Sequence, residues 1–190
     1  MKYISYYTMN TPYECDAGRL EMSFLNHNLD FCIYRVQNFR SWEKNCQYKA
    51  KVIRGALDDF KCPVVYTDID SEVLKDPVLF NGLDCDFASG YIKYTKDMPT
   101  RRCSGLLSGT MFFNYNQKAL DLLDRWIEKN ETNYEWDQRN LEHVLDKRKL
   151  DHYKLPDCYC KIFDSKWQKC DDPVILHHQK SRIYKRVING

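Results

Sequence analysis

The stretch PVVYTDID, residues 63–70, decides the fold of this chain. Its first half is an apolar, β-branched run, which is typical of a strand buried on both faces of a parallel sheet. Its second half carries two carboxylates two residues apart, Asp68 and Asp70. If the extended conformation persists through Asp70, both side chains project on the same side, because side chains alternate along a strand. Two like charges that close repel each other unless a cation or a proton lies between them.

Strand-like and helix-like patterns alternate on both sides of this stretch. Over 41–60 the apolar positions step by three or four residues, with Ser41 as the N-cap. The alternation predicts an α/β fold with an open, mostly parallel central sheet flanked by helices. No linker or repeat divides the chain, so we expect a single domain over 1–190, alone or within a longer protein. Strands are expected at 2–8, 31–36, 63–66, 87–94, 110–114 and 174–176, and helices at 13–26, 41–60, 116–127 and from 136 onward, before a basic tail.

Composition and charge exclude several classes of protein. The net charge of +2 over 190 residues argues against bulk electrostatic binding of nucleic acid. The hydrophobic fraction of 43% indicates a folded, globular chain. No apolar run approaches the roughly 18 residues that span a bilayer, and the first residues lack the pattern of a secretory signal. We therefore expect a soluble, cytoplasmic, monomeric protein without a nucleic-acid partner or a membrane span.

Nine cysteines are spread through the chain without a C-x-x-C pair, and an odd number does not suit a complete disulfide framework. Without a secretory signal, we interpret them as reduced thiols. Only Cys158, Cys160 and Cys170 are close enough in sequence for a metal cluster, but steps of two residues are not the usual zinc spacing.

A second apolar run, 174–176, ends in His177 and His178. In an open α/β sheet, ligands bind beyond the carboxyl ends of the strands. We therefore expect these histidines to lie close to Asp68 and Asp70. A neutral imidazole could join Asp68 and Asp70 around one Mg²⁺ or Mn²⁺, ions that take carboxylate oxygens and substrate phosphates. The alternative interpretation is that Asp70 caps the following turn and that Asp68 is solvated.

Two polar residues, Asp137 and Gln138, begin the helix expected from 136. Their spacing to Leu141, Val144 and Leu145 places both on or beside the core-facing stripe. A helix dipole favours an acid in the first turn by ~0.3–1 kcal/mol, which accounts for Asp137 but not for Gln138. The pair is therefore a candidate for substrate contact.

The tail after 176 is basic. It supplies four cations within seven residues, Lys180, Arg182, Lys185 and Arg186. These cations are either solvated or placed to neutralise a diphosphate, and Arg182 would suit the second role through its forked donors.

Together these motifs resemble those of nucleotide-sugar-dependent glycosyltransferases of the GT-A fold, in the family's order and over about 2–186. The compact length and the ILHHQKSR ending look most like the small transferases that large algal (chlorella) viruses encode for capsid glycans. The resemblance implies a mixed, mostly parallel sheet and metal-dependent transfer of a hexose or deoxyhexose. The donor would be a UDP-sugar and the acceptor a glycan or glycoprotein, in the host cytoplasm if the chain is viral. The motifs that carry the resemblance are PVVYTDIDSEVLKDP, SGTMFFNYNQKALDLLDRW, WDQRNLEHVL and VILHHQKSR.

The resemblance also implies a donor site. Asp68 and Asp70 would hold Mn²⁺ or Mg²⁺ against the two phosphates of the donor, with Asp68 also near the ribose. His177 matches the late histidine that often completes the shell of this metal. Thr8 and Asn10 match positions that line the nucleotide pocket.

Two further segments match positions around the transferred sugar. Ser108, Gly109 and Thr110 match a strand entry whose backbone runs beside that sugar. Asp137 and Gln138 match the helix-start pair that contacts the sugar's hydroxyls and its anomeric face. Asp137 would either stabilise an oxocarbenium-like sugar, which fits retention, or deprotonate the acceptor hydroxyl, which fits inversion. The likeness of this pair to retaining relatives favours retention.

The chain departs from the family after the late histidine. Many related enzymes carry Gly-x-x-Lys-Pro-Trp there, whereas this chain has Gln179-Lys180-Ser181-Arg182. The residue that clamps the phosphates therefore stays open between Lys180 and Arg182.

Two other functions fit part of the pattern. A strand ending in Asp-x-Asp also opens the phosphatases of the haloacid-dehalogenase type. Those enzymes carry the motif near the amino terminus with Gly-Thr or Gly-Val after it, whereas Ser71-Glu72-Val73 follows here. The non-enzymatic alternative is a nucleotide- or glycan-binding module that lost transfer, since 14 tyrosines and four tryptophans would suit sugar stacking.

Overall fold

The computed structural model describes residues 1–92, 105–146 and 149–189. Its central sheet consists of β1 Lys2–Thr8, β2 Phe31–Val36, β3 Val64–Thr67, β5 Phe87–Tyr91, β6 Leu106–Phe113 and β7 His152–Lys154. The strands lie in the order β2-β1-β3-β6-β5-β7. β1 pairs in parallel with β2 and β3, β5 pairs in parallel with β7, and β6 lies antiparallel between β3 and β5. Five strands therefore share one direction, which confirms the predicted α/β fold with a mixed, mostly parallel sheet.

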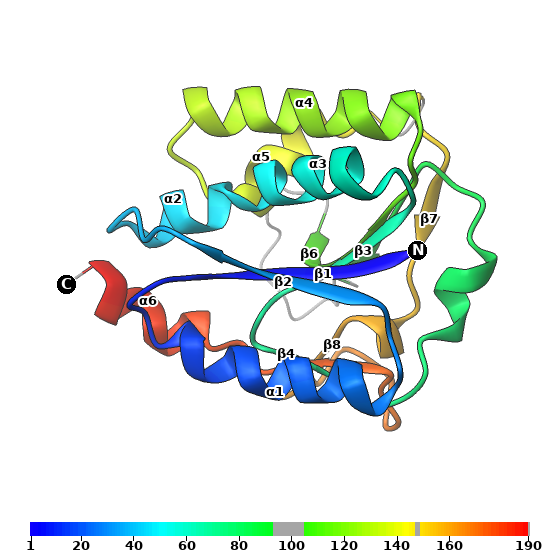
Figure 1. The fold of residues 1–190 in the computed structure, drawn as a ribbon, viewed down its shortest axis with the longest axis horizontal. Coiled ribbons are helices and arrows are strands. Elements are labelled where there is room, and N and C mark those ends of the chain that lie inside the picture. The colour runs from blue at the N-terminus through cyan, green and yellow to red at the C-terminus, as the bar shows by residue number, and fades with distance from the viewer. Residues whose placement is uncertain (93–104, 147–148, 190) are drawn as a thin grey trace.

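Helices cover both faces of this sheet (Figure 1). α1 Tyr13–Asn26 lies on one face, and α3 Lys49–Phe60, α4 Gln117–Thr132 and α5 Asp137–Val144 lie on the other. Each face has its own apolar core, one around Phe24 of α1 and one around Ile53 and Trp126 of α3 and α4. Two short helices, α2 Trp42–Gln47 and α6 Ser181–Asn189, lie at the end of the sheet where β1 finishes (Figure 1).

A second, three-stranded sheet forms from β4 Ser71–Val73, β8 Lys161–Ile162 and β9 Ile175–His177, in the order β4-β9-β8. Two short 3₁₀ helices, η1 Val78–Gly82 and η2 Asp157–Tyr159, complete the described elements. β4 pairs antiparallel with β9, and this register places Ser71 opposite His177. The chain just after Asp70 is thereby held against the strand end that carries the histidine.

Some bounds differ from the expectation. The helix predicted over 41–60 is divided into α2 and α3 at Tyr48, although the backbone of this residue stays helical (φ −66°, ψ −17°). The predicted cap is present, because Ser41 Oγ accepts a hydrogen bond from the Lys44 N–H at 3.3 Å. The strand expected at 110–114 begins earlier, at Leu106. The strand expected at 87–94 ends at Tyr91, and residues 93 and 94 lie outside the described part of the chain.

The basic tail is not a loop, because it folds into α6. The apolar residues Ile183, Tyr184 and Val187 recur there at helical spacing, a signal that the density of charges obscured. Tyr184 packs edge-on against Tyr13 of α1, with ring centroids 4.9 Å apart. The tail is thereby fixed against the body of the protein beside the strand end of His177.

The eight cysteines within the described residues are free thiols, as expected, and Cys103 lies outside them. Cys158, Cys160 and Cys170 do not form a metal-ligand group in this part of the chain. Over the same residues, no helix is long and apolar enough to cross a bilayer.

Candidate functional site

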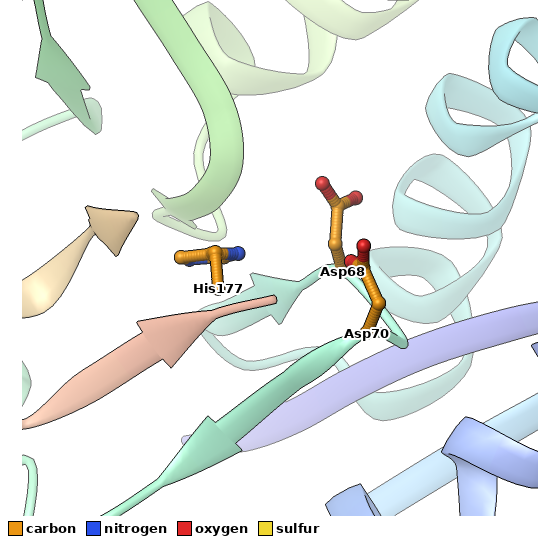
Figure 2. Close-up of side chains that lie close together, drawn as sticks. All are labelled: Asp68, Asp70 and His177. Atoms are coloured by element: carbon orange, nitrogen blue, oxygen red, sulfur yellow. The ribbon is translucent and has the colours of Figure 1, made fainter. Parts of the chain in front are cut away.

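The two carboxylates after β3 lie in a turn and not in a continued strand. The Ser71 N–H donates to the Asp68 carbonyl at 3.0 Å, and the Ser71 hydroxyl donates to the same oxygen at 2.6 Å. The condition that the chain stays extended through Asp70 is therefore not met. The turn nevertheless brings both carboxylates to the same side, with the His177 ring beside them at the end of β9 (Figure 2).

Asp68, Asp70 and His177 form a group that can hold a metal ion. One potential ligand atom from each lies within 4.8 Å of the other two, and no other such group occurs among the described residues. His177 is fixed by a 2.8 Å hydrogen bond between its Nε2 and Thr110 Oγ1. The alternative interpretation of a solvated Asp68 and a turn-capping Asp70 does not explain why the histidine joins them.

The electrostatics of these residues fit a divalent cation. Asp70 is 8% exposed, and burial, followed by the nearby Asp68 carboxylate, raises the pKa of Asp70 to about 7. Burial lowers the pKa of His177 to about 4, so its imidazole is neutral at neutral pH. Two carboxylates, one of which burial destabilises as an anion, and a neutral imidazole are a donor set suited to a divalent ion.

Gly109 makes room for this group. The Asp68 N–H donates to the Gly109 carbonyl at 2.8 Å, so β6 runs directly beside the first carboxylate. A Cβ atom on Gly109 would lie 2.8 Å from Cε1 of His177 and 3.3 Å from Oδ2 of Asp68. A residue with any side chain at this position would therefore displace the histidine or the carboxylate.

A buried lysine connects the candidate metal group to the candidate catalytic pair. Lys49, at the start of α3, is 5% exposed, and its Nζ lies 2.9 Å from Asp68 Oδ1 and 2.8 Å from Asp137 Oδ2. Burial alone would lower the pKa of Lys49, but Asp137 and Asp68 outweigh it and raise this pKa above its ordinary value. The sequence showed only a lysine on an otherwise apolar helix stripe, and that exception was the one signal that could have identified it.

Asp137 and Gln138 lie at the start of α5, on the inner side of that helix as predicted. Asp137 is buried and its Oδ2 accepts a 3.1 Å hydrogen bond from Ser108 Oγ. Gln138 Oε1 accepts a 3.4 Å hydrogen bond from the Ser108 N–H. The Asp137 carbonyl accepts a 2.8 Å hydrogen bond from Nε1 of the buried Trp126 in α4. Three of the expected sugar-contacting residues are therefore in mutual contact.

A cavity of about 240 Å³ lies next to these groups. Its lining includes Asp68, Asp70, Lys49, Ser108 and Asp137. Its remaining wall is largely aromatic, with Tyr6, Tyr13, Trp42, Tyr66 and Trp136.

The two residues expected in the nucleotide pocket lie in different environments. Thr8 is buried and lines the cavity. Asn10 is exposed, has a left-handed backbone (φ 57°), and its N–H donates to Glu14 Oε1 at 2.9 Å. Asn10 is not among the residues that line the cavity.

The two candidate phosphate-clamping residues also differ. The Lys180 backbone N–H donates to Asp70 Oδ2 at 2.7 Å, and its neighbours Gln179 and Ser181 line the cavity. Arg182 pairs with Asp164, and its guanidinium lies over the Phe163 ring at 6.0 Å. These contacts hold the Arg182 guanidinium away from the carboxylates of Asp68 and Asp70.

Comparisons with known proteins concern the fold and the family. The family model described as nucleotide-diphospho-sugar transferase matches residues 40–182. A search of curated proteins found no match. Among solved structures, a glycosyltransferase involved in glycosylation of the major capsid of PBCV-1 matches with a TM-score of 0.72 and 12% identity, over 98% of this chain and 97% of that chain.

Two further structures share the fold. The bifunctional glycosyltransferase WbbM matches with a TM-score of 0.64 and 11% identity, over 94% of this chain and 45% of that chain. The galactosyltransferase LgtC, in complex with donor and acceptor sugar analogues, matches with a TM-score of 0.54 and 12% identity, over 93% of this chain and 86% of that chain. At such identities the likeness concerns the fold alone.

Gly109→Ala tests the close packing of the metal group. We expect the new methyl group to displace His177, to lower the free energy of unfolding by about 1–3 kcal/mol and to abolish Mn²⁺ binding in calorimetry. Gly55→Ala is the matched control, because a Cβ on this α3 residue meets nothing within 4 Å. That variant should gain about 0.5–1 kcal/mol and keep the metal. Unchanged Mn²⁺ binding by Gly109→Ala would contradict the assignment.

Asp70→Asn tests the charge of the metal group through pH. Because burial raises the pKa of Asp70 from 3.8 to about 7, its ionisation destabilises the metal-free fold as pH rises through that range. In EDTA, the melting temperature of Asp70→Asn relative to wild type should therefore increase between pH 5 and pH 8, by about 3 °C or more. The titration of His177 changes stability with pH in the opposite direction. This contribution is present in both proteins and cancels in the difference between their melting temperatures. A difference independent of pH would show that Asp70 is not held as described.

Proposed function

This chain belongs to the nucleotide-diphospho-sugar transferase family, and we propose that it is a metal-dependent glycosyltransferase. It moves a hexose or deoxyhexose from a UDP-sugar to a hydroxyl group of a glycan or glycoprotein acceptor. The observation that carries the proposal is one cavity lined both by Asp68 and Asp70, which group with His177, and by the buried pair of Lys49 and Asp137. The first group suits a diphosphate with its cation, and the second suits a sugar with developing positive charge.

Mn²⁺ or Mg²⁺ would be held by Asp68, Asp70 and His177. When bound, it supplies a Lewis acid for the negative charge that develops on the departing diphosphate. The imidazole in this donor set favours Mn²⁺, because Mg²⁺ prefers oxygen ligands alone. Thr110 orients the imidazole by its hydrogen bond to Nε2, and Gly109 leaves the space that the group requires.

Lys180 is the better candidate for the cation that neutralises the leaving diphosphate. Its backbone already binds Asp70, and it lies between two residues that line the cavity. Arg182 would have to leave Asp164 and Phe163 to reach the same place. Thr8 is positioned to line the nucleotide part of the cavity, whereas a role for Asn10 stays a prediction from the resemblance.

Asp137 acts on the anomeric carbon of the donor, with Gln138 beside it. The contacts of its carboxylate with Lys49 and with Ser108 both involve Oδ2, so the group cannot swing towards an incoming hydroxyl without breaking them. A fixed carboxylate suits electrostatic stabilisation of an oxocarbenium-like sugar, which goes with retention. The acceptor hydroxyl would then lose its proton to another group, for which an oxygen of the departing diphosphate is in place.

The rest of the proposal follows the relatives. A glycoprotein glycan is the proposed acceptor, as the PBCV-1 enzyme of the same fold is involved in glycosylation of the major capsid. A cytoplasmic site of action stays a prediction from the sequence. We also propose that 1–190 act as one domain and as a monomer. The phosphatase alternative has no support from the family or the fold, whereas the non-catalytic binding module is separated by the measurements below.

Thermal-shift measurements with UDP, GDP, CMP and ADP, each with and without Mn²⁺, test the donor site. We expect UDP to raise the melting temperature only with Mn²⁺, since a ligand at ~100 times its dissociation constant adds ~2.7 kcal/mol, which is several degrees here. Asp68→Asn should abolish this rise. Asp172→Asn, at an exposed carboxylate paired with Lys75, should keep it. The absence of any nucleotide shift would overturn the donor site.

Release of UDP from UDP-sugars separates an enzyme from a binding module. We expect Asp137→Asn to keep the Mn²⁺-dependent UDP shift and to lower UDP release by a factor of about 100 or more, because it removes the charge beside the anomeric carbon. Undiminished release by Asp137→Asn would exclude that carboxylate from the reaction. Nucleotide binding without hydrolysis or transfer in the wild-type chain would favour the binding module.

A further inference from the structure

The loop between α4 and α5 is held rigidly at the mouth of the cavity. Gln47 Nε2 donates to the carbonyl of Asn133 at 2.8 Å and to the carbonyl of Glu135 at 2.6 Å. Asn140 Nδ2 donates to the same Glu135 carbonyl at 3.0 Å and to Asn130 Oδ1 at 2.9 Å. Side chains from α2 and α5 therefore fix the backbone of this loop, independently of the exposed Tyr134 side chain.

Two aromatic side chains on this loop remain exposed to solvent. Tyr134 is 93% exposed and Trp136 is 36% exposed. The inner side of Trp136 packs edge-on against Trp42, with ring centroids 6.4 Å apart. A single exposed aromatic residue needs no explanation, but two such residues, separated by one position on a fixed loop beside a cavity, are typical of a recognition surface.

This aromatic surface continues into the reaction centre. Trp136 lines the cavity together with Trp42, and it is the N-cap residue directly before Asp137. Asp137 in turn contacts Lys49 and Ser108. A molecule lying on Trp136 would therefore be next to the carboxylate that faces the donor sugar.

The charged side chains around this surface have close polar or charged neighbours among the residues that the structure describes. Arg139 lies over the Trp136 ring at 5.8 Å and 3.8 Å from Glu142 Oε2. His143 lies 3.7 Å from Glu135 Oε2. The surface thus offers aromatic area and hydrogen-bonding groups without an excess of positive charge, which suits an uncharged ligand better than a phosphorylated or acidic one.

We propose that Tyr134 and Trp136 form an acceptor platform, on which a pyranose ring of an uncharged glycan packs its C–H face. Polarised C–H groups of a sugar favour the negative face of an aromatic ring. The inference rests on the proposed function, because it names the acceptor side of the same site. The sugar ring that packs on Trp136 is the one whose hydroxyl group is glycosylated. Tyr134 extends the surface for a neighbouring sugar.

Saturation-transfer NMR with methyl pyranosides tests the platform. The probes are the methyl glycosides of glucose, galactose, mannose, xylose, fucose and rhamnose, added with UDP and Mn²⁺ and, separately, without them. We expect transfer to the ring C–H protons of at least one probe. Binding should be about tenfold weaker in Tyr134→Ala and in Trp136→Ala, the effect of losing an aromatic contact. Trp136→Phe should retain much of it, because it keeps a ring.

Two features keep the result interpretable. Tyr134→Ala leaves the fold intact, because the side chain is almost fully exposed. Tyr153→Ala is the matched control, since this tyrosine is 39% exposed but lies on β7, at the edge of the sheet opposite β2. Equal binding by wild type and Tyr134→Ala and Trp136→Ala, or no transfer to any probe, would overturn the platform. So would light scattering that shows a dimer dissociated by Tyr134→Ala without glycoside binding, because the occupant would then be a second copy of the chain.

The platform and the proposed function fail in different ways. A UDP shift with Mn²⁺ but no pyranoside transfer leaves the donor site and removes the platform. Pyranoside transfer that depends on Tyr134 and Trp136, without any nucleotide shift, leaves the platform and removes the transferase proposal.

Discussion

The ammonium group of Lys49 is the interaction on which the site depends. It lies buried between Asp68, which follows β3, and Asp137, which opens α5. Charges taken out of water are costly, and loss of one partner from a buried pair costs about 3–5 kcal/mol. Lys49 therefore joins α3, β3 and α5 at one point, and it keeps the two carboxylates at a fixed separation.

The charged residues around Lys49 carry an excess of negative charge. Among the described residues that line the cavity, Asp68, Asp70 and Asp137 bring three carboxylates, and Lys49 brings the one ammonium group. Hydrogen bonds from a backbone N–H and from hydroxyl groups satisfy oxygen atoms without adding charge. A divalent cation beside His177 would remove the excess, and its remaining coordination positions would bind diphosphate oxygens. In the proposed function, metal and donor therefore bind at one electrostatic site.

A short segment, 42–49, contributes to the cavity wall, to the loop before α5 and to the buried ion pair. Trp42 forms part of its aromatic wall, Gln47 fixes the loop before α5, and Lys49 supplies the ammonium group. The division between α2 and α3 at Tyr48 lies within this segment. Because one segment serves the wall, the loop and the ion pair, the proposed donor and acceptor sides are positioned by the same packing of α2, α3 and α5.

The amino-acid sequence by itself determined the features with a local signal: the α/β alternation, the buried strand before Asp68 and Asp70, and the inward start of α5 at Asp137. It also placed His177 at a strand end, because an apolar run followed by polar residues is a signal contained in a few consecutive positions. The turn after Asp68, the small sheet and the role of Lys49 were not readable in this way. Two- and three-residue strands have no periodicity, and the target of a long side chain lies on other elements. Only the tertiary structure decided that Ser71 pairs with His177 and that one lysine reaches two carboxylates, because strand register and side-chain reach are set by packing between segments distant in sequence.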